Sequence, residues 1–206
     1  MARNKRITFL ADLTKGYPCV LDIGTDHGLV LKKAFDQGYI QHAIASDINE
    51  EPLNQAKRNL KNYPVHYVTS DGFLAINKPY DLVIIAGMGA YLICDILEHA
   101  PKDDVDYILQ ANDKIEILRK YLMDNQFMIT DEYVIHDKFH YVILKVKRGF
   151  MELSLDELYL GPILKGKDEA KPYYQIKANQ IEKILPQADP KRQEELLKML
   201  KIYKNF

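Results

Sequence analysis

The chain has 206 residues, 47% of them hydrophobic, and a formal net charge of −1. This length supports one substantial core with a small appendage, and the near-neutral charge gives no overall electrostatic argument for a nucleic-acid partner. No apolar run is long enough to span a bilayer, and the start lacks a signal-peptide core, so we expect a cytoplasmic protein without a membrane partner. Cys19 and Cys94 lie in apolar runs, and the histidines form no group. We therefore expect reduced thiols and no metal site.

Short Val/Ile/Leu-rich runs alternate with segments of helical periodicity through the first part of the chain. Five runs are expected to be strands, at residues 19–23, 43–48, 65–71, 81–87 and 106–110. Four of them are followed by helix-compatible stretches, at residues 28–37, 50–61, 88–99 and 113–125. The alternation predicts an α/β fold with a doubly wound, mostly parallel sheet.

The pattern changes at residues 127–149, where two strand-like runs are separated by Asp137 and Lys138. They predict an antiparallel hairpin that closes one edge of the sheet. Such an ending is unusual in a plain dinucleotide-binding domain. It is common in the Rossmann-like sheet of class I methyltransferases, whose last strand is antiparallel.

Two helical segments follow, at residues 168–185 and 191–204, each with one apolar stripe. They predict a small C-terminal helical hairpin whose helices pack on each other. We therefore divide the chain into a domain at residues 1–150 and a C-terminal extension at residues 151–206.

The turn after the first strand reads GTDHG over residues 24–28 and lacks the middle glycine of the G-x-G-x-x-G pattern. Asp22 stands two residues before this turn, at the end of the strand. A carboxylate there repels a pyrophosphate and suits a cationic group, such as the amino or sulfonium group of S-adenosylmethionine (SAM). Asp26 and His27 belong to the loop that faces the same cleft.

Acidic residues also end the second and third predicted strands. Asp47 is placed to accept hydrogen bonds from both ribose hydroxyls, with capping of the helix at 50–61 as the alternative. Asp71 and Phe73 suit contacts with an adenine, although a turn-forming Asp-Gly explains the same residues. Because ligands bind at the carboxyl edge of such sheets, three acids at three successive strand ends favour a ligand site.

The fourth strand ends in IIAGMGA, residues 84–90. Gly87 and Gly89 allow the backbone to approach a ligand closely, and the following helix offers free N–H groups at its start. We expect a methyl acceptor to be presented here, beside Ala86 and Met88. A tight turn between strand and helix is the alternative.

Several segments along the chain carry a further signal: DIGTDHG, SDIN, SDG, DLVIIAGMGA, HYVILKVKRG and LGPIL. Together they resemble the TrmK family, bacterial tRNA (adenine-N1)-methyltransferases that act on adenine 22. The resemblance covers residues 5–204 and implies a SAM-dependent enzyme with tRNA as its partner. The predicted cofactor contacts are Asp22, Gly24, Thr25, His27, Asp47, Ile48, Asp71, Gly72 and Ala86. The predicted catalytic positions are Asp26, Gly87, Met88 and Gly89.

The reaction that this resemblance implies needs little acid–base chemistry beforehand. Adenine N1 carries an in-plane lone pair, so positioning and desolvation should dominate. Asp26 is the candidate to stabilise the developing charge or to take the released proton. The base must be unpaired or flipped out of its helix, and Phe73 or Tyr91 would then stack on it.

The distribution of charge bears on contacts with tRNA. Residues 1–137 hold 14 basic and 20 acidic side chains, whereas residues 138–206 hold 14 basic and 9 acidic side chains, so the positive excess lies in the second part of the chain. This fits a local basic patch, or equally a solvated strand end. The helical hairpin would contact tRNA by shape. Phosphate contacts are expected from five basic residues: Lys5, Arg6, Lys145, Lys147 and Arg148.

Three other functions stay open on the sequence alone. A SAM-dependent enzyme with a small-molecule or protein acceptor would make the basic strand end incidental. An NAD(P)-dependent oxidoreductase is disfavoured by Asp22 and by the missing glycine. A non-catalytic RNA-binding module is disfavoured because a protein without a ligand need not keep the acidic set.

Overall fold

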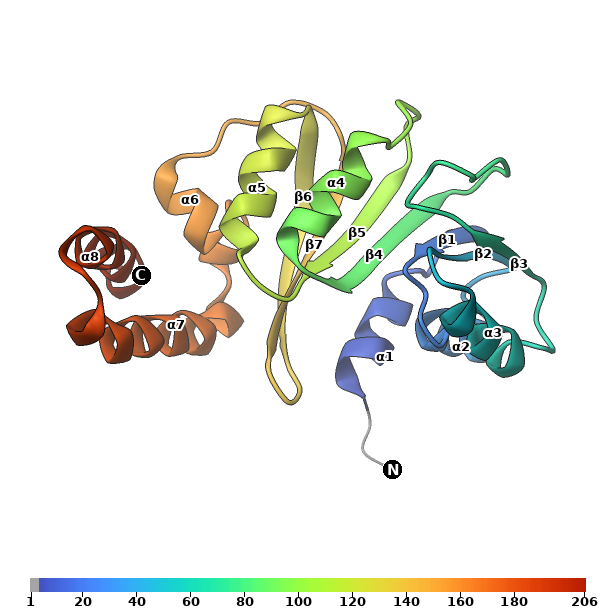
Figure 1. Cartoon of the computed structure of the whole chain (residues 1–206), viewed down its shortest axis with the longest axis horizontal. Helices are drawn as coiled ribbons and strands as arrows, with labels where there is room; N and C mark the ends of the chain where they lie inside the picture. The colour runs from blue at the N-terminus through green and yellow to red at the C-terminus, as the bar shows by residue number, and fades with distance from the viewer. Residues whose placement is uncertain (1–3) are drawn as a thin grey trace.

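A computed structural model describes residues 4–206, in which strands and helices alternate along most of the chain (Figure 1). The strands are β1 (Cys19–Ile23), β2 (His42–Asp47), β3 (Val65–Thr69), β4 (Leu82–Met88), β5 (Asp106–Ala111), β6 (Phe127–His136) and β7 (His140–Arg148). The helices are α1 (Lys5–Asp12), α2 (Leu29–Asp36), α3 (Glu50–Asn59), α4 (Ala90–Glu98), α5 (Ile115–Asp124), α6 (Leu155–Leu160), α7 (Lys171–Ile184) and α8 (Pro190–Lys204). Short 3₁₀ turns occur at Leu164–Gly166, Asp168–Ala170 and Leu185–Gln187.

The strands of residues 4–206 form one sheet in the order β3-β2-β1-β4-β5-β7-β6. β1 to β5 run parallel, whereas β7 inserts antiparallel between β5 and β6. The predicted doubly wound sheet with an antiparallel last strand is therefore confirmed. The order of strands reverses beside β1, where Val20 pairs with Ala43 on one side and Leu82 on the other. In sheets of this kind the ligand crevice forms at the carboxyl ends of the strands at such a point.

Side chains along each strand alternate between two apolar layers on opposite faces of the sheet. Val20 packs in the layer that contains Leu10 of α1, and the next residue, Leu21, packs in the layer that contains Ile93 of α4. Residues of α1, α2 and α3 contribute to the first layer, and residues of α4 and α5 contribute to the second. Because of this alternation, Asp22 points toward the face that α1 covers.

Two short helices, α1 and α6, were not predicted from the sequence. In α1, the Asn4 side chain caps the first turn by accepting a hydrogen bond from the Ile7 N–H at 3.2 Å, and Leu10 is buried. In α6, Ser154 and Glu157 form a capping box. α1 packs beside α2 and brings its amino-terminal turn close to the carboxyl ends of the central strands.

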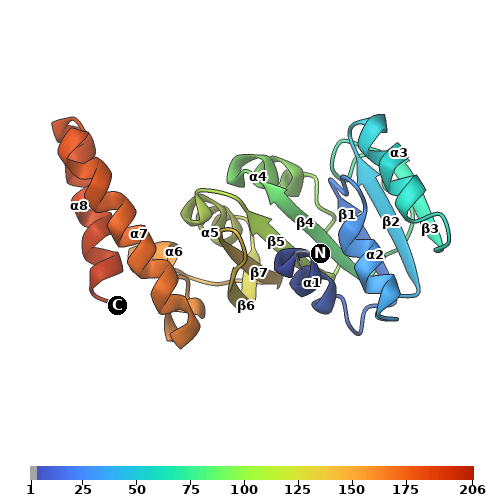
Figure 2. The ribbon, with the colours of Figure 1, turned by 90° about the horizontal axis from the view of Figure 1, so that it is seen from below.

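The predicted C-terminal hairpin is confirmed as α7 and α8, which lie at the opposite end of the molecule from α3 (Figures 1 and 2). Tyr174 and Ile181 of α7 are buried together with Leu196 and Tyr203 of α8, and these four residues belong to the apolar stripes expected from the sequence. Their apolar layer is continuous with the layer under α4 and α5. The division of the chain near residue 150 stays a prediction.

A buried ion pair joins the sheet to the C-terminal extension. Arg119 of α5 and Glu132 of β6 are both fully buried, with Nη2 of the arginine 2.8 Å from Oε1 of the glutamate. Arg119 also donates to two carbonyls in the last turn of α6, and Glu132 accepts from the N–H groups of Ile163 and Leu164. Gly161 passes so close that a Cβ there would lie 2.5 Å from the Glu132 carboxylate. The LGPIL segment is therefore shaped to fold over this pair.

None of the helices formed by residues 4–206 combines the length and the apolar character that crossing a membrane requires.

Candidate active site

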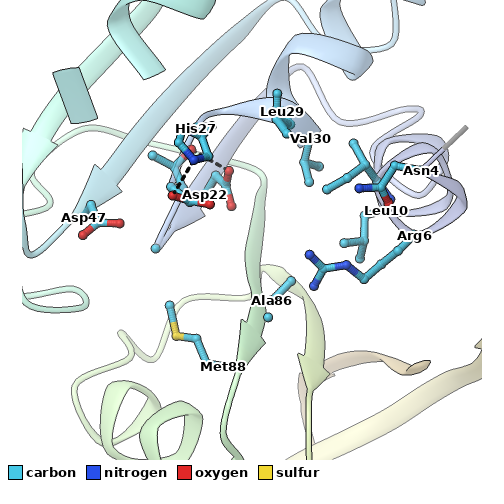
Figure 3. Close-up of a pocket in the computed structure, with 15 residues that line it drawn as sticks. Asn4, Arg6, Leu10, Asp22, His27, Leu29, Val30, Asp47, Ala86 and Met88 are labelled. Atoms are coloured by element: carbon cyan, nitrogen blue, oxygen red, sulfur yellow. Dashed lines mark hydrogen bonds and ion pairs between the residues drawn. The ribbon is translucent and has the colours of Figure 1, made fainter. Parts of the chain in front are cut away.

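A pocket of about 440 Å³ opens at the carboxyl ends of β1, β2 and β4 (Figure 3). Its walls come from α1, from the turn after β1, and from the ends of β2 and β4. The lining residues are Asn4, Arg6, Ile7, Leu10, Asp22, Gly24, Thr25, Asp26, His27, Leu29, Val30, Asp47, Ala86, Gly87 and Met88. Most of the predicted cofactor and catalytic residues therefore meet around one cavity.

Asp22 presents a buried carboxylate to this pocket. The residue is only 5% exposed, and the Thr25 hydroxyl donates to its Oδ2 at 2.7 Å. Burial raises the pKa of Asp22 to about 6, although the hydrogen bond from Thr25 lowers it. The negative charges of Asp47 and Asp26 raise this pKa further. A desolvated carboxylate of this kind gains strongly from a cationic partner.

Asp47 ends β2 at the far side of the pocket, as Figure 3 shows. Its Oδ1 accepts a hydrogen bond from the backbone N–H of Asn49 at 3.0 Å, which shapes the turn into α3. Asn49, not Asp47, is the N-cap residue of α3, so the alternative role as a helix cap is wrong. The arrangement leaves the second carboxylate oxygen free to meet a ligand.

The turn after β1 is held by its backbone. The N–H groups of Gly24 and Thr25 both donate to the Ser46 carbonyl, at 2.8 and 3.0 Å. Asp26 takes a left-handed conformation with φ of 51°, and its side chain is 70% exposed beside His27, with 3.5 Å between Oδ1 and Nε2. Asp26 therefore stands at the mouth of the pocket, in contact with solvent.

The end of β4 forms the opposite wall. The pairing of β4 with β5 shifts register between Ala86 and Met88, so Gly87 bulges, with φ of +84°. The Gly87 carbonyl accepts a hydrogen bond from the Asn112 side chain at 2.7 Å. Asp113 accepts from the Ala90 N–H at 3.1 Å and so satisfies the start of α4. The AGMG segment is thus an ordered edge rather than a loose loop.

The remaining predicted cofactor contacts, and the two aromatic residues expected to stack on a base, lie outside the pocket lining. Ile48 is 60% exposed, Asp71 is also exposed, and Gly72 packs against Ile96 of α4. Phe73 is 7% exposed and belongs to the apolar core, so the expectation that its ring stacks on a base is wrong. Tyr91 remains available, because its side chain is exposed in the first turn of α4.

The basic residues of β7 do not face the pocket. Because β7 runs antiparallel to β5, its last residues lie at the amino-terminal edge of the parallel strands. The six residues of β5 separate that edge from the cleft, a distance on the order of 20 Å. Lys145 lies 3.5 Å from Asp106 in an ion pair, and Arg148 donates to two backbone carbonyls after α4. Lys147 lines a separate depression at that far edge. Phosphate contacts from these three residues stay a prediction, and they would lie at this far edge of the sheet, away from the pocket.

Arg6 of α1 and Gln110 of β5 add to the site beyond the predicted cofactor and catalytic residues. Arg6, which was expected on the phosphate-binding surface, instead points into the pocket, whereas Lys5 is exposed. Arg6 donates to Oε1 of Gln110 at 2.8 Å. Gln110 is fully buried at the end of an apolar strand, and a lone amide in such a run is a signal that the sequence did contain.

A family model described as TrmK, tRNA (adenine(22)-N(1))-methyltransferase, matches residues 20–204. The chain belongs to the TrmK family. The tRNA (adenine(22)-N(1))-methyltransferase of Bacillus subtilis is 30% identical over 168 residues, which cover 77% of this chain and 70% of that protein. A Streptococcus agalactiae structure of the NADB-Rossmann superfamily superposes with a TM-score of 0.90 at 27% identity, covering 100% of this chain and 97% of its own. A Streptococcus pneumoniae structure in complex with SAM superposes with a TM-score of 0.86 at 27% identity, and the match covers 98% of this chain and 98% of that chain.

The pocket of this TrmK-family chain suits SAM by charge and by size. SAM carries an ammonium and a sulfonium group, and Asp22, Asp26 and Asp47 place carboxylates on the pocket wall. The volume of about 440 Å³ lies within the range of roughly 300–1,000 Å³ that is typical of small-molecule sites. Within residues 4–206, no group of three or more His, Cys, Asp or Glu side chains is arranged to hold a metal ion.

We expect the SAM affinity of the TrmK-family enzyme to fall as the pH is lowered through about 6, because Asp22, whose pKa burial raises to about 6, loses its charge there. Below that pH the affinity should drop by up to about tenfold per pH unit. Calorimetric titration from about pH 8 to pH 5 measures this. Asp22→Asn should bind SAM weakly, with most of the pH dependence gone. A wild-type affinity that stays constant over the whole interval would contradict the role of Asp22.

Proposed function

We propose that this chain transfers the methyl group of SAM to N1 of adenine 22 in tRNA, at the pocket between β1 and β4. The observation that carries the proposal is that the buried Asp22 carboxylate faces the end of β4, where Gly87 lies, across one pocket. A site for a cationic group therefore lies next to backbone that a second substrate is able to approach. Membership of the TrmK family supplies the acceptor.

Residues at three strand ends would hold SAM. Asp22 accepts from the ammonium group, and the free oxygen of Asp47 accepts from the ribose hydroxyls. The exposed Ile48 and Asp71 offer the adenine an apolar surface and an acceptor for its amino group. When bound, SAM supplies an electrophilic methyl group. The protein fixes the position of that group and limits the access of water to it.

The acceptor side is formed by the end of β4 and the start of α4. Gly87 and Gly89 carry no side chain, so a planar base is able to approach the backbone. Tyr91 is 56% exposed, and the Lys114 ammonium lies 4.7 Å from its ring centroid. An aromatic ring with a cation above it suits both stacking on an unpaired base and attraction to the neighbouring phosphates.

The proton balance needs no general base before the transfer. Adenine N1 would attack the methyl carbon with its own lone pair while the bond from that carbon to sulfur breaks, so that S-adenosylhomocysteine leaves as a thioether. The methylated adenine then carries the positive charge until a proton leaves its exocyclic amine. Asp26, exposed at the mouth of the pocket, is the carboxylate that stabilises this charge and passes the proton to water. Because its substrate is tRNA, we also propose that the enzyme acts in the cytoplasm and that α7 and α8 contact the folded tRNA.

Transfer of labelled methyl groups to two tRNA transcripts tests the proposal. A transcript with adenine at position 22 should accept label from SAM, and a matched transcript with guanine at position 22 should accept none. Equal labelling of both transcripts would overturn the assigned acceptor. Measured SAM binding without any labelling of RNA would point instead to a small-molecule or protein acceptor.

A further inference from the structure

The Arg6 guanidinium lies at the pocket and not on the outer surface of α1. Asp22, Ala86 and Gln110 lie near the carboxyl ends of three neighbouring strands. The alternation of each strand puts their side chains on the sheet face that α1 covers. Figure 3 shows the Arg6 side chain extending from α1 toward Ala86, across the pocket from Asp22 and Asp47. Arg6 therefore belongs to the binding site.

Arg6 is a permanent positive charge in an otherwise acidic cavity. Among the pocket-lining residues of the described chain it is the one Lys or Arg, facing Asp22, Asp26 and Asp47. Within residues 4–206 its guanidinium forms no ion pair, and its side-chain hydrogen bond goes to Gln110. A guanidinium has five N–H donors, so most of them remain available for a ligand.

A chain of amides holds Arg6 in this position. The Gln110 amide nitrogen donates to Oδ1 of Asn112 at 3.0 Å, and the Asn112 amide donates to the Gly87 carbonyl at 2.7 Å. These bonds turn the oxygen of the buried Gln110 toward Arg6. The guanidinium also lies 5.3 Å from the ring centroid of Tyr141. A cation that is oriented in this way before a ligand arrives is typical of a binding group.

Gly87 gives the guanidinium the room that it occupies. A Cβ atom at Gly87 would lie 3.0 Å from Nη1 of Arg6, and the φ of +84° disfavours any side chain there. The absence of a side chain at Gly87 therefore serves the approach of Arg6 as well as that of the acceptor.

We propose that Arg6 binds the α-carboxylate in the methionine part of SAM, an inference that rests on the proposed function. SAM has two cationic groups, which Arg6 repels, and the carboxylate is its one anionic group. Asp22 and Arg6 then bind the ammonium and the carboxylate, which are attached to the same carbon atom. Two parallel N–H donors of a guanidinium match the two oxygens of a carboxylate.

A tRNA phosphate is the other anion that this enzyme meets, and the surroundings of Arg6 disfavour it. Arg6 is half-buried and lies among three carboxylates, which repel a polyanion more strongly than a small ligand that also carries cationic groups.

Decarboxylated SAM, which lacks only the carboxylate, provides the test. In calorimetric titrations of the full chain without tRNA, wild type should bind SAM on the order of 10- to 100-fold more tightly than decarboxylated SAM. In Arg6→Met, the two ligands should bind within about twofold of each other, because the guanidinium is gone. Gln110→Glu places a carboxylate on Nη1 of Arg6 and should also reduce the preference, with Arg6 still present.

Arg58→Met is the matched control, because Arg58 is exposed on α3 and likewise donates to a glutamine, Gln55, at 2.6 Å. This variant should keep the wild-type preference for SAM. The inference is overturned if Arg6→Met keeps that preference. It is equally overturned if Arg6→Met keeps the preference and weakens only the binding of tRNA in a gel shift. Failure of wild type to bind either ligand would instead overturn the proposed function.

Discussion

Replacing Arg119 with methionine is expected to lower the free energy of unfolding by about 3–5 kcal/mol. The substitution leaves the Glu132 carboxylate buried without its ion-pair partner and removes the donor to two carbonyls of α6. Because these bonds join α5 and β6 to the start of the C-terminal extension, the packing of α7 and α8 should loosen as well. Urea unfolding followed by far-ultraviolet circular dichroism measures the loss.

Lys120→Met is the matched control for this prediction. Lys120 is the next residue of α5 and pairs with Asp124 four residues later, but both side chains are about half exposed. An exposed pair of this kind contributes only about 0.3–0.5 kcal/mol. A double variant, Arg119→Met with Glu132→Leu, should remain destabilised, because the N–H groups of Ile163 and Leu164 then lose their acceptor. A loss below about 1 kcal/mol in Arg119→Met would contradict the structural role of the pair.

Replacing Asp47 with asparagine is expected to weaken SAM binding by about 100-fold or more, because two charge-assisted hydrogen bonds to the ribose are lost. The fold should be preserved, since the asparagine oxygen still accepts the hydrogen bond from the Asn49 N–H. Calorimetric titration with SAM measures the affinity, and a thermal melt measures the stability of the same sample.

Asp95→Asn serves as the control for Asp47, because Asp95 is an exposed carboxylate on α4 away from the pocket. It should bind SAM as wild type does. If Asp47→Asn bound SAM within about threefold of wild type, the ribose would have to be held by other groups.

The fold followed from the sequence where apolar periodicity was continuous. The run at 19–23 read as a buried strand because all of its residues but Asp22 are apolar, and the run at 106–110 because Tyr107, Ile108 and Leu109 are consecutive apolar residues. The hairpin at 127–149 was visible as two long alternating runs. The helix α1 was missed because eight residues with few buried side chains give a weak periodic signal. The helix α6 carried its signal in the capping box of Ser154 and Glu157, but six residues are too few for periodicity.

The site was predictable where a residue ends a parallel strand, since all such ends meet at one edge. Asp22 and Asp47 follow this rule, and the structure brings both to one pocket. The same geometry explains why Lys145 does not line this pocket, because it lies on an antiparallel strand whose last residues reach the opposite edge. The place of Arg6 in the pocket was not predicted, because the position of α1 depends on tertiary packing that no local pattern encodes.

Identification of the methylated atom tests the central claim most directly. Wild-type protein would be incubated with methyl-labelled SAM and an unmodified tRNA, and the digested nucleosides and fragments would be analysed by mass spectrometry. The account predicts a single labelled nucleoside, 1-methyladenosine, at position 22, and its loss in Asp47→Asn. Label on another atom or at another position, or undiminished labelling by Asp47→Asn, would contradict it.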